Sequence, residues 1–323
     1  MSDIIVSGMR PTGALHIGHY VGVLKNWIEY QNTHECFYFV ADWHAVTSNY
    51  DNLAIVHAAR KEYVRGWVAA GIDPNKAHIY NQSSIPEVLF LNQIFLSLTP
   101  PGWADRSPSW KDLKTNPSKK LDNLGFYNYP ILQTADVAIV NGKFVPVGED
   151  QVAHLEIGRE IIRKFNRLYK TQLPEPVAKL TAVPKLLGID GSKMSSSLGN
   201  VISLNESVKS LQKKVNKMKT DDLRGGVEKP GNPDNCSVFS YHKIFSSQEA
   251  INDVNQSCRG AQLSCGECKQ NLGKFMQEEL MPISEKMGKI TDDQCEDILT
   301  QGNRVVGEKA KALWQELKIQ IKL

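Results

Sequence analysis

The sequence predicts an α/β protein with a Rossmann-like parallel sheet that has helices on both faces, followed by a helical domain. Up to Asn200, short apolar runs alternate with helical patterns, as expected for a parallel sheet covered by helices. After this residue the strand pattern fades, and helical patterns continue to Leu323. The 323 residues, 41% of them hydrophobic, suffice for a sizeable core and a second, smaller domain. We therefore expect an α/β domain at 1–202 and a helical domain at 203–323.

The expected elements follow the apolar spacing along the chain. The run at 4–8 (IIVSG) predicts a buried strand, and a Pro/Gly turn leads from it to a helix at 16–31. The run at 36–42 (CFYFVAD) predicts a second buried strand, and an Ala-rich helix is expected from 52 to 71. The remaining expectations are strands at 78–83 and 143–150, a helix that begins near Tyr129, a mobile loop or insertion at 99–123, and an irregular segment at 225–235.

The composition limits the classes of function. The opening MSDIIVSGMR lacks the basic start and apolar stretch of a signal peptide, and no run reaches the ~18 apolar residues of a membrane span. We expect a cytoplasmic protein. The net charge of +3 is too small to indicate nucleic-acid binding by itself. Five lysines crowd a short helical stretch, for which a solvated helix face is the simplest explanation: Lys209, Lys213, Lys214, Lys217 and Lys219.

A short motif, HIGH, lies where the first strand gives way to the first helix. The helix start offers free N–H groups and a positive dipole end, which suit a phosphate. Gly18 has no side chain to keep an adenine ring from the backbone. His16 and His19 can donate hydrogen bonds to phosphate oxygens as charge develops. Two incidental polar residues at a helix start would give the same pattern.

A second segment, 191–197 (GSKMSSS), is a loop of small residues with one lysine. Such a loop can close over a triphosphate and bring the Lys193 ammonium to the leaving pyrophosphate. Taken alone it would be an ordinary surface loop. The two segments in this order resemble the HIGH and KMSKS signatures of class I aminoacyl-tRNA synthetases.

The resemblance covers most of the chain and narrows to the tryptophanyl-tRNA synthetases. It rests on SGMRPTGALHIGHY, on VPVGEDQ with HLEIGREIIRKFN, and on SVKSLQKKVNKMKTD. It implies that L-tryptophan is activated with ATP and Mg²⁺ to tryptophanyl-adenylate plus pyrophosphate, and is then transferred to the 3′ end of tRNA(Trp). Catalysis would be positioning and charge stabilisation by His16, His19 and Lys193, without a covalent enzyme intermediate.

The resemblance also implies an ATP site. Its residues come from both signatures, from the turn after the first strand and from the stretch after the strand at 143–150, where three of them would meet the ribose. They are Gly8, Arg10, Pro11, Thr12, Gly18, His19, Gly148, Glu149, Asp150, Leu186, Lys193, Met194, Ser195, Ser196 and Ser197.

One position departs from the family pattern, because Ser196 stands where KMSKS has its second lysine. Some phosphate stabilisation must then come from elsewhere. Lys111 is our candidate, since WKDLK resembles the family's loop that presents a lysine to the triphosphate. A solvated loop lysine is an equally good explanation.

The amino-acid pocket is expected on the helix that begins at Tyr129, which places Tyr129, Gln133 and Asp136 on one face. The Asp136 carboxylate could accept a hydrogen bond from an indole N–H or from a phenol hydroxyl. A tyrosyl enzyme is therefore the nearest alternative, and Gln133 weakens the case for tryptophan slightly. The resemblance implies tryptophan contacts from Val6, His44, Tyr129, Gln133, Asp136, Val145, Val147 and Gln151.

Two features favour tryptophan. Val6 stands where tyrosyl enzymes typically present a tyrosine to the substrate hydroxyl, and a valine leaves an apolar wall with more room. Val145 and Val147 face one way from a strand and suit the face of an indole.

Four of the six cysteines lie close together in sequence, at Cys236, Cys258, Cys265 and Cys268. Free buried cysteines are the simplest alternative, but disulfides are not expected in a reducing cytosol, and four thiolates can hold zinc or a [4Fe–4S] cluster. The spacing resembles a subset of bacterial tryptophanyl enzymes that carry an iron–sulfur cluster. We favour [4Fe–4S], with zinc as the alternative.

The resemblance implies further partners and an arrangement of the chain. It predicts a homodimer, a tRNA anticodon-binding role for the helical domain, and a last helix that folds back onto the first domain. Besides the tyrosyl enzyme, two alternatives remain: a nucleotidyltransferase that adenylates a small metabolite, and a non-catalytic relative that binds RNA. The helical domain argues against the former, and the intact signature residues argue against the latter.

Overall fold

The computed structural model describes residues 3–115, 121–180, 186–192, 194 and 198–323. The chain divides into two compact units. The first comprises Met1–Gly13, Val23–Ala182 and Thr291–Leu323, and the second comprises Ala14–Gly22 and Val183–Ile290. Each unit is described in turn.

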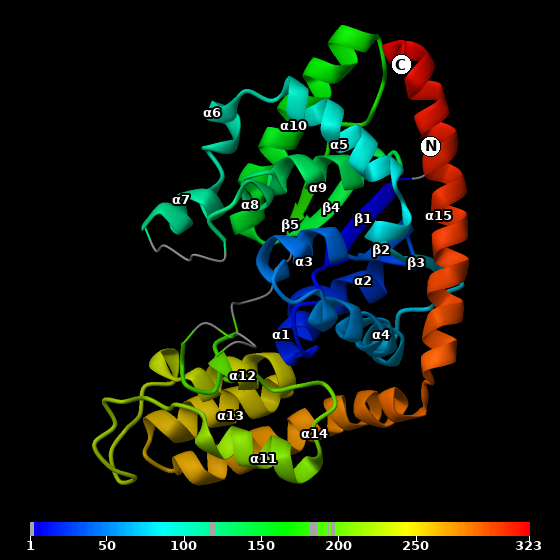
Figure 1. Ribbon diagram of the computed structural model, residues 1–323. Coiled ribbons are helices and arrows are strands. Elements are labelled where there is room, and N and C mark those ends of the chain that lie inside the picture. The colour runs from blue at the N-terminus through cyan, green and yellow to red at the C-terminus, as the bar shows by residue number, and fades with distance from the viewer. Residues whose placement is uncertain (1–2, 116–120, 181–185, 193, 195–197) are drawn as a thin grey trace. The chain divides into compact units, whose positions relative to one another are not determined.

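The first unit is built on a five-stranded sheet in the order β3-β2-β1-β4-β5, and every described strand pair is parallel (Figure 1). Its inner strands are nearly continuous apolar runs, as expected for strands that are covered on both faces. The parallel sheet and the helices around it confirm the predicted fold class. The bounds are β1 Ile4–Met9, β2 Glu35–Val40, β3 Ala77–Asn81, β4 Phe144–Val147 and β5 Val177–Leu180.

Successive side chains of the inner strands point to opposite faces of the sheet. Val6 and Phe37 belong to the core that includes residues of α5, α9 and α10. Tyr38 points the other way, where its ring stacks on Trp27 of α2 at 4.2 Å and its hydroxyl donates to the Trp27 carbonyl. Trp67 of α4 meets Trp27 edge-on at 5.0 Å, so aromatic packing fills this second face.

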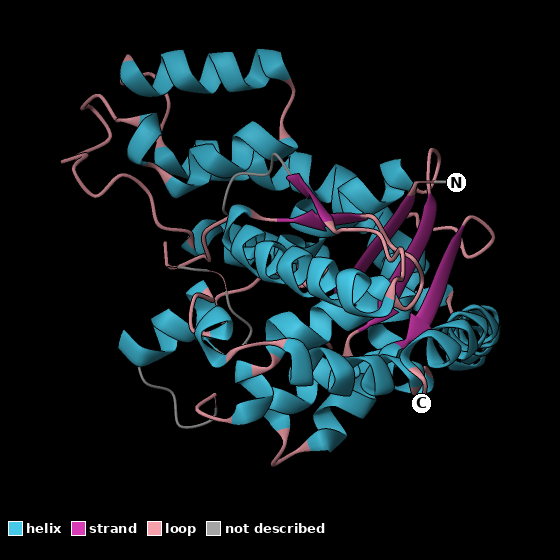
Figure 2. Ribbon diagram, turned by 90° about the horizontal axis from the view of Figure 1, so that it is seen from above, coloured by secondary structure: helices cyan, strands magenta, loops and turns pink. Residues whose placement is uncertain are grey.

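Helices surround the sheet along the whole unit (Figure 2). Those of the first unit are α2 Lys25–Tyr30, α3 Asp42–Asn49, α4 Leu53–Ala70, η2 Gln82–Ser84, α5 Glu87–Leu98, α6 Pro101–Ala104, α7 Pro108–Thr115, α8 Leu124–Tyr127, α9 Tyr129–Ala138, η3 Glu149–Gln151, α10 Val152–Tyr169 and α15 Asp292–Ile321. No helix among the residues placed here is both long and apolar enough to cross a membrane.

The long helix α15 packs along β3. Its Gly302 lies directly against the strand backbone, because a Cβ atom at this position would overlap the carbonyl oxygen of Ile79. Asn303 accepts the Asn81 N–H through its side-chain oxygen at 2.9 Å. The helix therefore covers the strand at backbone distance, and it belongs to the same unit as the sheet.

The second unit is helical. It contains α1 Ile17–His19, α11 Val208–Lys217, η5 Pro233–Asn235, α12 Ser237–Phe245, α13 Gln248–Arg259 and α14 Cys265–Lys289, and the π-helical turn η1 Tyr20–Leu24 follows α1 at the edge of the unit. A bridge between His16 and Ser203, with hydrogen bonds on either side of it, joins the first segment of this unit to the second.

Three expectations were wrong in detail. The segment 99–123 is not a plain loop, because Pro101 and Pro108 begin the short helices α6 and α7, as proline can at a first helical position. The helix expected at 16–31 is divided into α1, η1 and α2. The edge strand β5 was not predicted. Its Val177 and Leu180 are exposed, so its sequence has little of the apolar pattern of the inner strands.

We predict that Gly302→Ala lowers the free energy of unfolding by about 2 kcal/mol or more, because the new methyl group must displace backbone at the α15–β3 contact. Gly307→Ala is the matched control on the same helix, since its Cβ would lie 3.8 Å from Ile85 Cδ1 in ordinary contact. The control should be neutral or stabilising by up to ~1 kcal/mol through helix propensity. Urea unfolding of both variants measures the difference, and equal stabilities would contradict the described packing.

Candidate functional site

The predicted amino-acid pocket gathers at the carboxyl edge of the sheet, where open α/β sheets bind their ligands. Gly8 is near the end of β1, Asp42 begins α3 just after β2, and Gln82 follows β3 directly. The chain leaves β4 at Val147 and enters η3 at Glu149. The ends of four parallel strands thus deliver polar residues to one side of the sheet.

A buried carboxylate organises this edge. Asp136 of α9 is 2% exposed and accepts two hydrogen bonds, one on each oxygen. His44 Nε2 lies 2.8 Å from Oδ2, and Gln82 Nε2 donates to Oδ1 at 2.7 Å. Gln82 Oε1 in turn accepts the backbone N–H of His44 at 3.3 Å. The three residues form a closed ring of hydrogen bonds that joins α3, η2 and α9.

The ring explains how a charge is tolerated at this depth. Burial raises the pKa of the Asp136 carboxyl above its usual value, and the hydrogen bonds from His44 and Gln82 offset part of that rise. An ionised carboxylate has about four lone-pair sites, so about two remain for a ligand after both bonds are made. His44 donates from Nε2, and its buried Nδ1 has no hydrogen-bond partner in the described part of the chain.

Tyr129 lies beside this ring. Its side chain meets the imidazole of His44 with ring centroids 4.6 Å apart and that of His154 at 5.3 Å. Burial raises the pKa of the Tyr129 hydroxyl, Arg10 lowers it, and Asp136 and Asp150 raise it further. The predicted residues Arg10, Asp136 and Asp150 are therefore all within electrostatic range of Tyr129.

A second polar chain continues from η3. His154 Nδ1 lies 2.8 Å from Gln151 Oε1, and its Nε2 lies 2.8 Å from Ser107 Oγ. Burial lowers the pKa of His154 to about 4, so the imidazole is neutral at pH 7. Gln151 also donates to Asp150 at 3.0 Å. His154 thus holds the Gln151 amide in one orientation.

Apolar residues line the same region of the sheet. Val6, Val145 and Val147 are all buried. A side chain at Gly8 would overlap the ring of Phe39. The buried Oε1 of Gln133 has no hydrogen-bond partner among the residues described. Pro11 is buried after β1, whereas Thr12 is exposed.

The phosphate signatures belong to the second unit. His16 caps α1: its Nδ1 accepts the Gly18 N–H at 3.1 Å, and the His16 N–H donates to His19 Nδ1 at 3.3 Å. The two imidazoles lie 3.9 Å apart, centroid to centroid. Burial lowers the pKa of His16 to about 4, so it is neutral at pH 7 and carries its proton on Nε2. A Cβ on Gly18 would lie 2.9 Å from His16 and 3.0 Å from Met194 Sδ, so the two signatures touch there.

The base of the second signature is also ordered. Asp190 accepts the Ser192 N–H at 3.0 Å and the Asn200 side-chain N–H at 2.9 Å. Gly191 (φ +80°) and Gly199 (φ +64°) adopt left-handed conformations that favour glycine. Leu186 is partly buried, while Lys193, Ser195, Ser196 and Ser197 lie outside the described residues.

Other predicted positions are more dispersed. Lys111 is exposed on α7, and Gly148 and Glu149 form the turn into η3. A Cβ on Gly148 would lie 2.8 Å from Asp150 Oδ1, so the turn is tight. Lys209, Lys213 and Lys217 are exposed on α11, whereas Lys214 pairs with Glu206 and Lys219 with Asp222.

The four clustered cysteines come from the ends of helices: Cys236 precedes α12, Cys258 ends α13, and Cys265 and Cys268 begin α14. Burial, with smaller contributions from the other three thiols, raises the pKa of Cys268 to about 12, so all three lie near Cys268. Across the described ranges, no set of three or more His, Cys, Asp or Glu side chains is arranged as a metal-ion site.

Two side chains lie beside the cysteine sulfurs. Arg224 Nη1 donates to Cys265 Sγ at 3.5 Å, and His242 Nε2 lies 3.4 Å from Cys268 Sγ. A guanidinium stabilises a thiolate, as metal–thiolate sites require. Burial lowers the pKa of His242, which favours the neutral imidazole.

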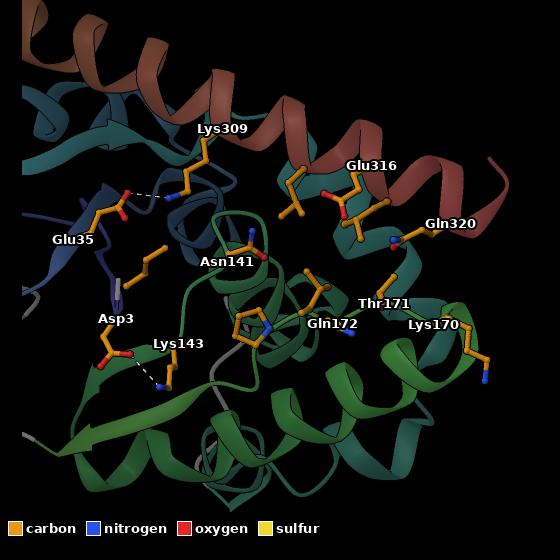
Figure 3. A pocket seen from close by; sticks show the side chains of 15 residues that line it. Asp3, Glu35, Asn141, Lys143, Lys170, Thr171, Gln172, Lys309, Glu316 and Gln320 are labelled. Carbon is orange, nitrogen blue, oxygen red and sulfur yellow. Dashed lines mark hydrogen bonds and ion pairs between the residues drawn. The ribbon is translucent and has the colours of Figure 1, made fainter. Parts of the chain in front are cut away.

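A cavity of about 690 Å³ opens at the opposite, amino edge of the sheet, against α15 (Figure 3). Its charged residues include two ion pairs, between Lys309 and Glu35 at 2.9 Å and between Lys143 and Asp3 at 3.0 Å. The cavity contains none of the predicted site residues, so the chemistry is assigned to the carboxyl edge.

Sequence reasoning missed Gln82 and His154, which hold Asp136 and Gln151. The position of Gln82 had a usable signal, because it is close to the end of the strand predicted at 78–83 and therefore near the carboxyl edge, but its pairing with Asp136 had none. His154 lies inside a long amphipathic helix, α10, where a buried histidine carries no distinctive pattern.

The comparisons with known proteins agree with this geometry. The family model described as tRNA synthetases class I (W and Y) matches residues 2–281. A tryptophan–tRNA ligase from Thermotoga maritima is 44% identical over 319 residues, covering 97% of this chain and 97% of the relative. One from Aquifex aeolicus is 36% identical and covers 97% and 98%.

Solved structures give the same result. Tryptophanyl-tRNA synthetase from Campylobacter jejuni, complexed with ADP and tryptophan, is 29% identical with a TM-score of 0.86, covering 99% of this chain and all of that one. A tyrosyl-tRNA synthetase from Archaeoglobus fulgidus, at 21% identity and a TM-score of 0.69, shares the fold. The chain belongs to the class I tRNA synthetases for tryptophan and tyrosine. Within that family it is a member of the tryptophan–tRNA ligases.

Proposed function

We infer that this chain activates L-tryptophan with ATP to tryptophanyl-adenylate and pyrophosphate, and then transfers tryptophan to the 3′ end of tRNA(Trp). The family supplies the reaction. The observation that supports tryptophan as the substrate is the buried Asp136, whose two oxygens are both hydrogen-bonded at the carboxyl edge of the sheet.

Indole recognition follows from this site. In this proposal a lone pair of Asp136 accepts the indole N–H, and the buried Val6 and the two valines of β4 form an apolar wall of the pocket. Val6 has no hydroxyl, so the phenol of a tyrosine substrate would lack the hydrogen-bond partner that tyrosyl enzymes typically provide at this position. A pocket that bonds a substrate N–H rejects analogues that lack it, because the acceptor is then left unpaired. The pocket therefore favours tryptophan over tyrosine.

The polar end of the amino acid has its own partners. Gln133 Oε1, which is buried and has no described partner, is placed to accept from the α-ammonium. Gln151, oriented by His154, reaches the same end, and Tyr129 packs between His44 and His154. These groups orient the substrate carboxylate for attack.

In the first step a carboxylate oxygen of tryptophan attacks the ATP α-phosphorus as the bond to pyrophosphate breaks. Gly8, Arg10, Pro11 and Thr12 after β1, and Gly148, Glu149 and Asp150 before α10, hold the nucleotide. His16 donates from Nε2 to developing phosphate charge, with His19, Lys193 and Lys111 as further donors. Leu186, Met194 and the serines at 195–197 complete the ATP site, and Mg²⁺ arrives with the nucleotide.

The helices α11–α14 serve tRNA in this proposal, as an anticodon-binding region. The exposed lysines of α11 neutralise phosphates, which makes tRNA affinity sensitive to salt. The protein acts in the cytoplasm as a homodimer. Support for the dimer is an apolar face of α5, where Leu89, Phe90 and Leu96 are exposed and Phe90 lies 5.5 Å from Trp314.

The four cysteines hold a metal group, for which we favour [4Fe–4S] over zinc. Support comes from their electrostatic proximity and from the Arg224 guanidinium, which donates to the sulfur of Cys265. When bound, such a group would cross-link the ends of α12, α13 and α14 and contribute folding free energy. All four cysteines belong to the helical unit, whereas the residues that we assign to tryptophan belong to the sheet unit.

ATP–pyrophosphate exchange tests the function. We predict exchange with tryptophan and none above background with tyrosine, and a loss of about 10²-fold or more in the His19→Asn variant, which removes a donor to the phosphates. His57→Asn, at an exposed position on α4, is the matched control and should exchange normally. Exchange driven by tyrosine would indicate the tyrosyl activity. Exchange with neither amino acid would leave a metabolite adenylating enzyme or an RNA-binding relative.

Metal analysis of anaerobically purified protein tests the cysteine site. We predict about four irons per chain, with the broad visible absorbance of an iron–sulfur cluster. Cys258→Ser should abolish both, whereas Cys295→Ala, which changes a buried cysteine of α15, should abolish neither. About one zinc per chain would favour the alternative, and no bound metal would refute a metal role for these cysteines.

A further inference from the structure

Gln82 is the best buried amide at the carboxyl edge of the sheet. It is 0% exposed and is the first residue of η2, directly after β3. Its amide nitrogen donates to Asp136 Oδ1 at 2.7 Å, and its amide oxygen accepts the His44 N–H at 3.3 Å. Only this orientation of the amide satisfies both partners, because the carboxylate accepts and the backbone N–H donates.

The Asp136 carboxylate would otherwise be free to turn, because the terminal torsion of aspartate is broad and roughly two-fold. His44 holds one oxygen and Gln82 holds the other, so the plane of the carboxylate is fixed. The Gln82 bond also favours the ionised form, which has no hydroxyl to compete with a substrate N–H.

We propose that Gln82 is a specificity-determining residue of the tryptophan pocket. It acts through Asp136 as a positioning residue: it fixes the carboxylate so that a remaining lone pair faces the substrate indole N–H. This inference rests on the proposed function and extends it to a residue outside the pocket expected from the sequence. Asp136 supplies the contact, and Gln82 makes that contact selective.

The test replaces Gln82 with methionine, which keeps the length of the side chain and removes both hydrogen bonds. ATP–pyrophosphate exchange is measured with tryptophan and with β-(3-benzothienyl)alanine, in which sulfur replaces the indole N–H. For tryptophan we expect kcat/KM to fall about 10- to 100-fold, the value of a hydrogen bond to a charged group. The loss should appear mainly in KM, because the N–H contact is the same in ground and transition states.

For the benzothienyl analogue we expect little change, so the preference for tryptophan collapses by about tenfold or more. A purely structural role predicts equal losses for both amino acids, and that result would overturn the inference. Gln82→Asn retains an amide but is one methylene shorter, and should give an intermediate preference. This variant also keeps the test decisive if Gln82→Met does not fold.

Asn92→Leu is the matched control. Asn92 is a buried amide of α5 that is 7% exposed and takes no part in the ring around Asp136. Its loss can lower stability, but the preference for tryptophan over the analogue should remain that of the wild type. A changed preference in this control would count against a specific role for Gln82.

The wild-type enzyme separates failure of the inference from failure of the proposed function. No exchange with tryptophan overturns both. If the wild type uses tryptophan and the benzothienyl analogue equally well, Asp136 does not recognise the indole N–H. The inference about Gln82 then fails as well. Discrimination that is strong in the wild type and unchanged in Gln82→Met overturns the Gln82 inference alone.

Discussion

The carboxyl edge of the sheet in the first unit depends on hydrogen bonds that stabilise one buried carboxylate. Asp136 lies at the carboxyl edge of a parallel sheet with 2% of its surface exposed, and an isolated carboxylate there would be protonated or would cost several kcal/mol. Three segments meet this requirement together, since the start of α3, the residue after β3 and the inner face of α9 all join the ring. In the proposed function, substrate recognition and the local fold therefore depend on the same hydrogen bonds.

The chemical tasks are divided between the two units. Residues assigned to the amino acid belong to the sheet unit, while the HIGH and GSKMSSS signatures belong to the helical unit. Within the helical unit, Gly18 and Met194 show that the signatures meet, and Tyr20 donates to Glu279 of α14 at 3.0 Å. The helix that begins with Cys265 and Cys268 is thus bonded to the segment that carries the first signature.

Much of this could be predicted from the sequence. Periodicity predicted four of the five strands, and the two signatures predicted the family. The pocket on the helix that begins at Tyr129 remains a prediction. β5 was not predicted because an exposed edge strand lacks a strong apolar pattern. The short helices at 101–115 were not predicted because prolines there suggest a loop.

The role of Gln82 was not predicted for a different reason. Its role depends on a partner 54 positions away in sequence, a long-range pairing that no local pattern encodes.

The central claim is that Asp136 accepts the indole N–H of the substrate. Proton NMR of tryptophan labelled with ¹⁵N at the indole nitrogen, bound to the protein without ATP, observes that proton directly. The account predicts a bound indole proton shifted well downfield of the free amino acid and protected from exchange with water, with both effects lost in Asp136→Ala. A bound indole proton with the shift and exchange rate of free tryptophan would contradict it.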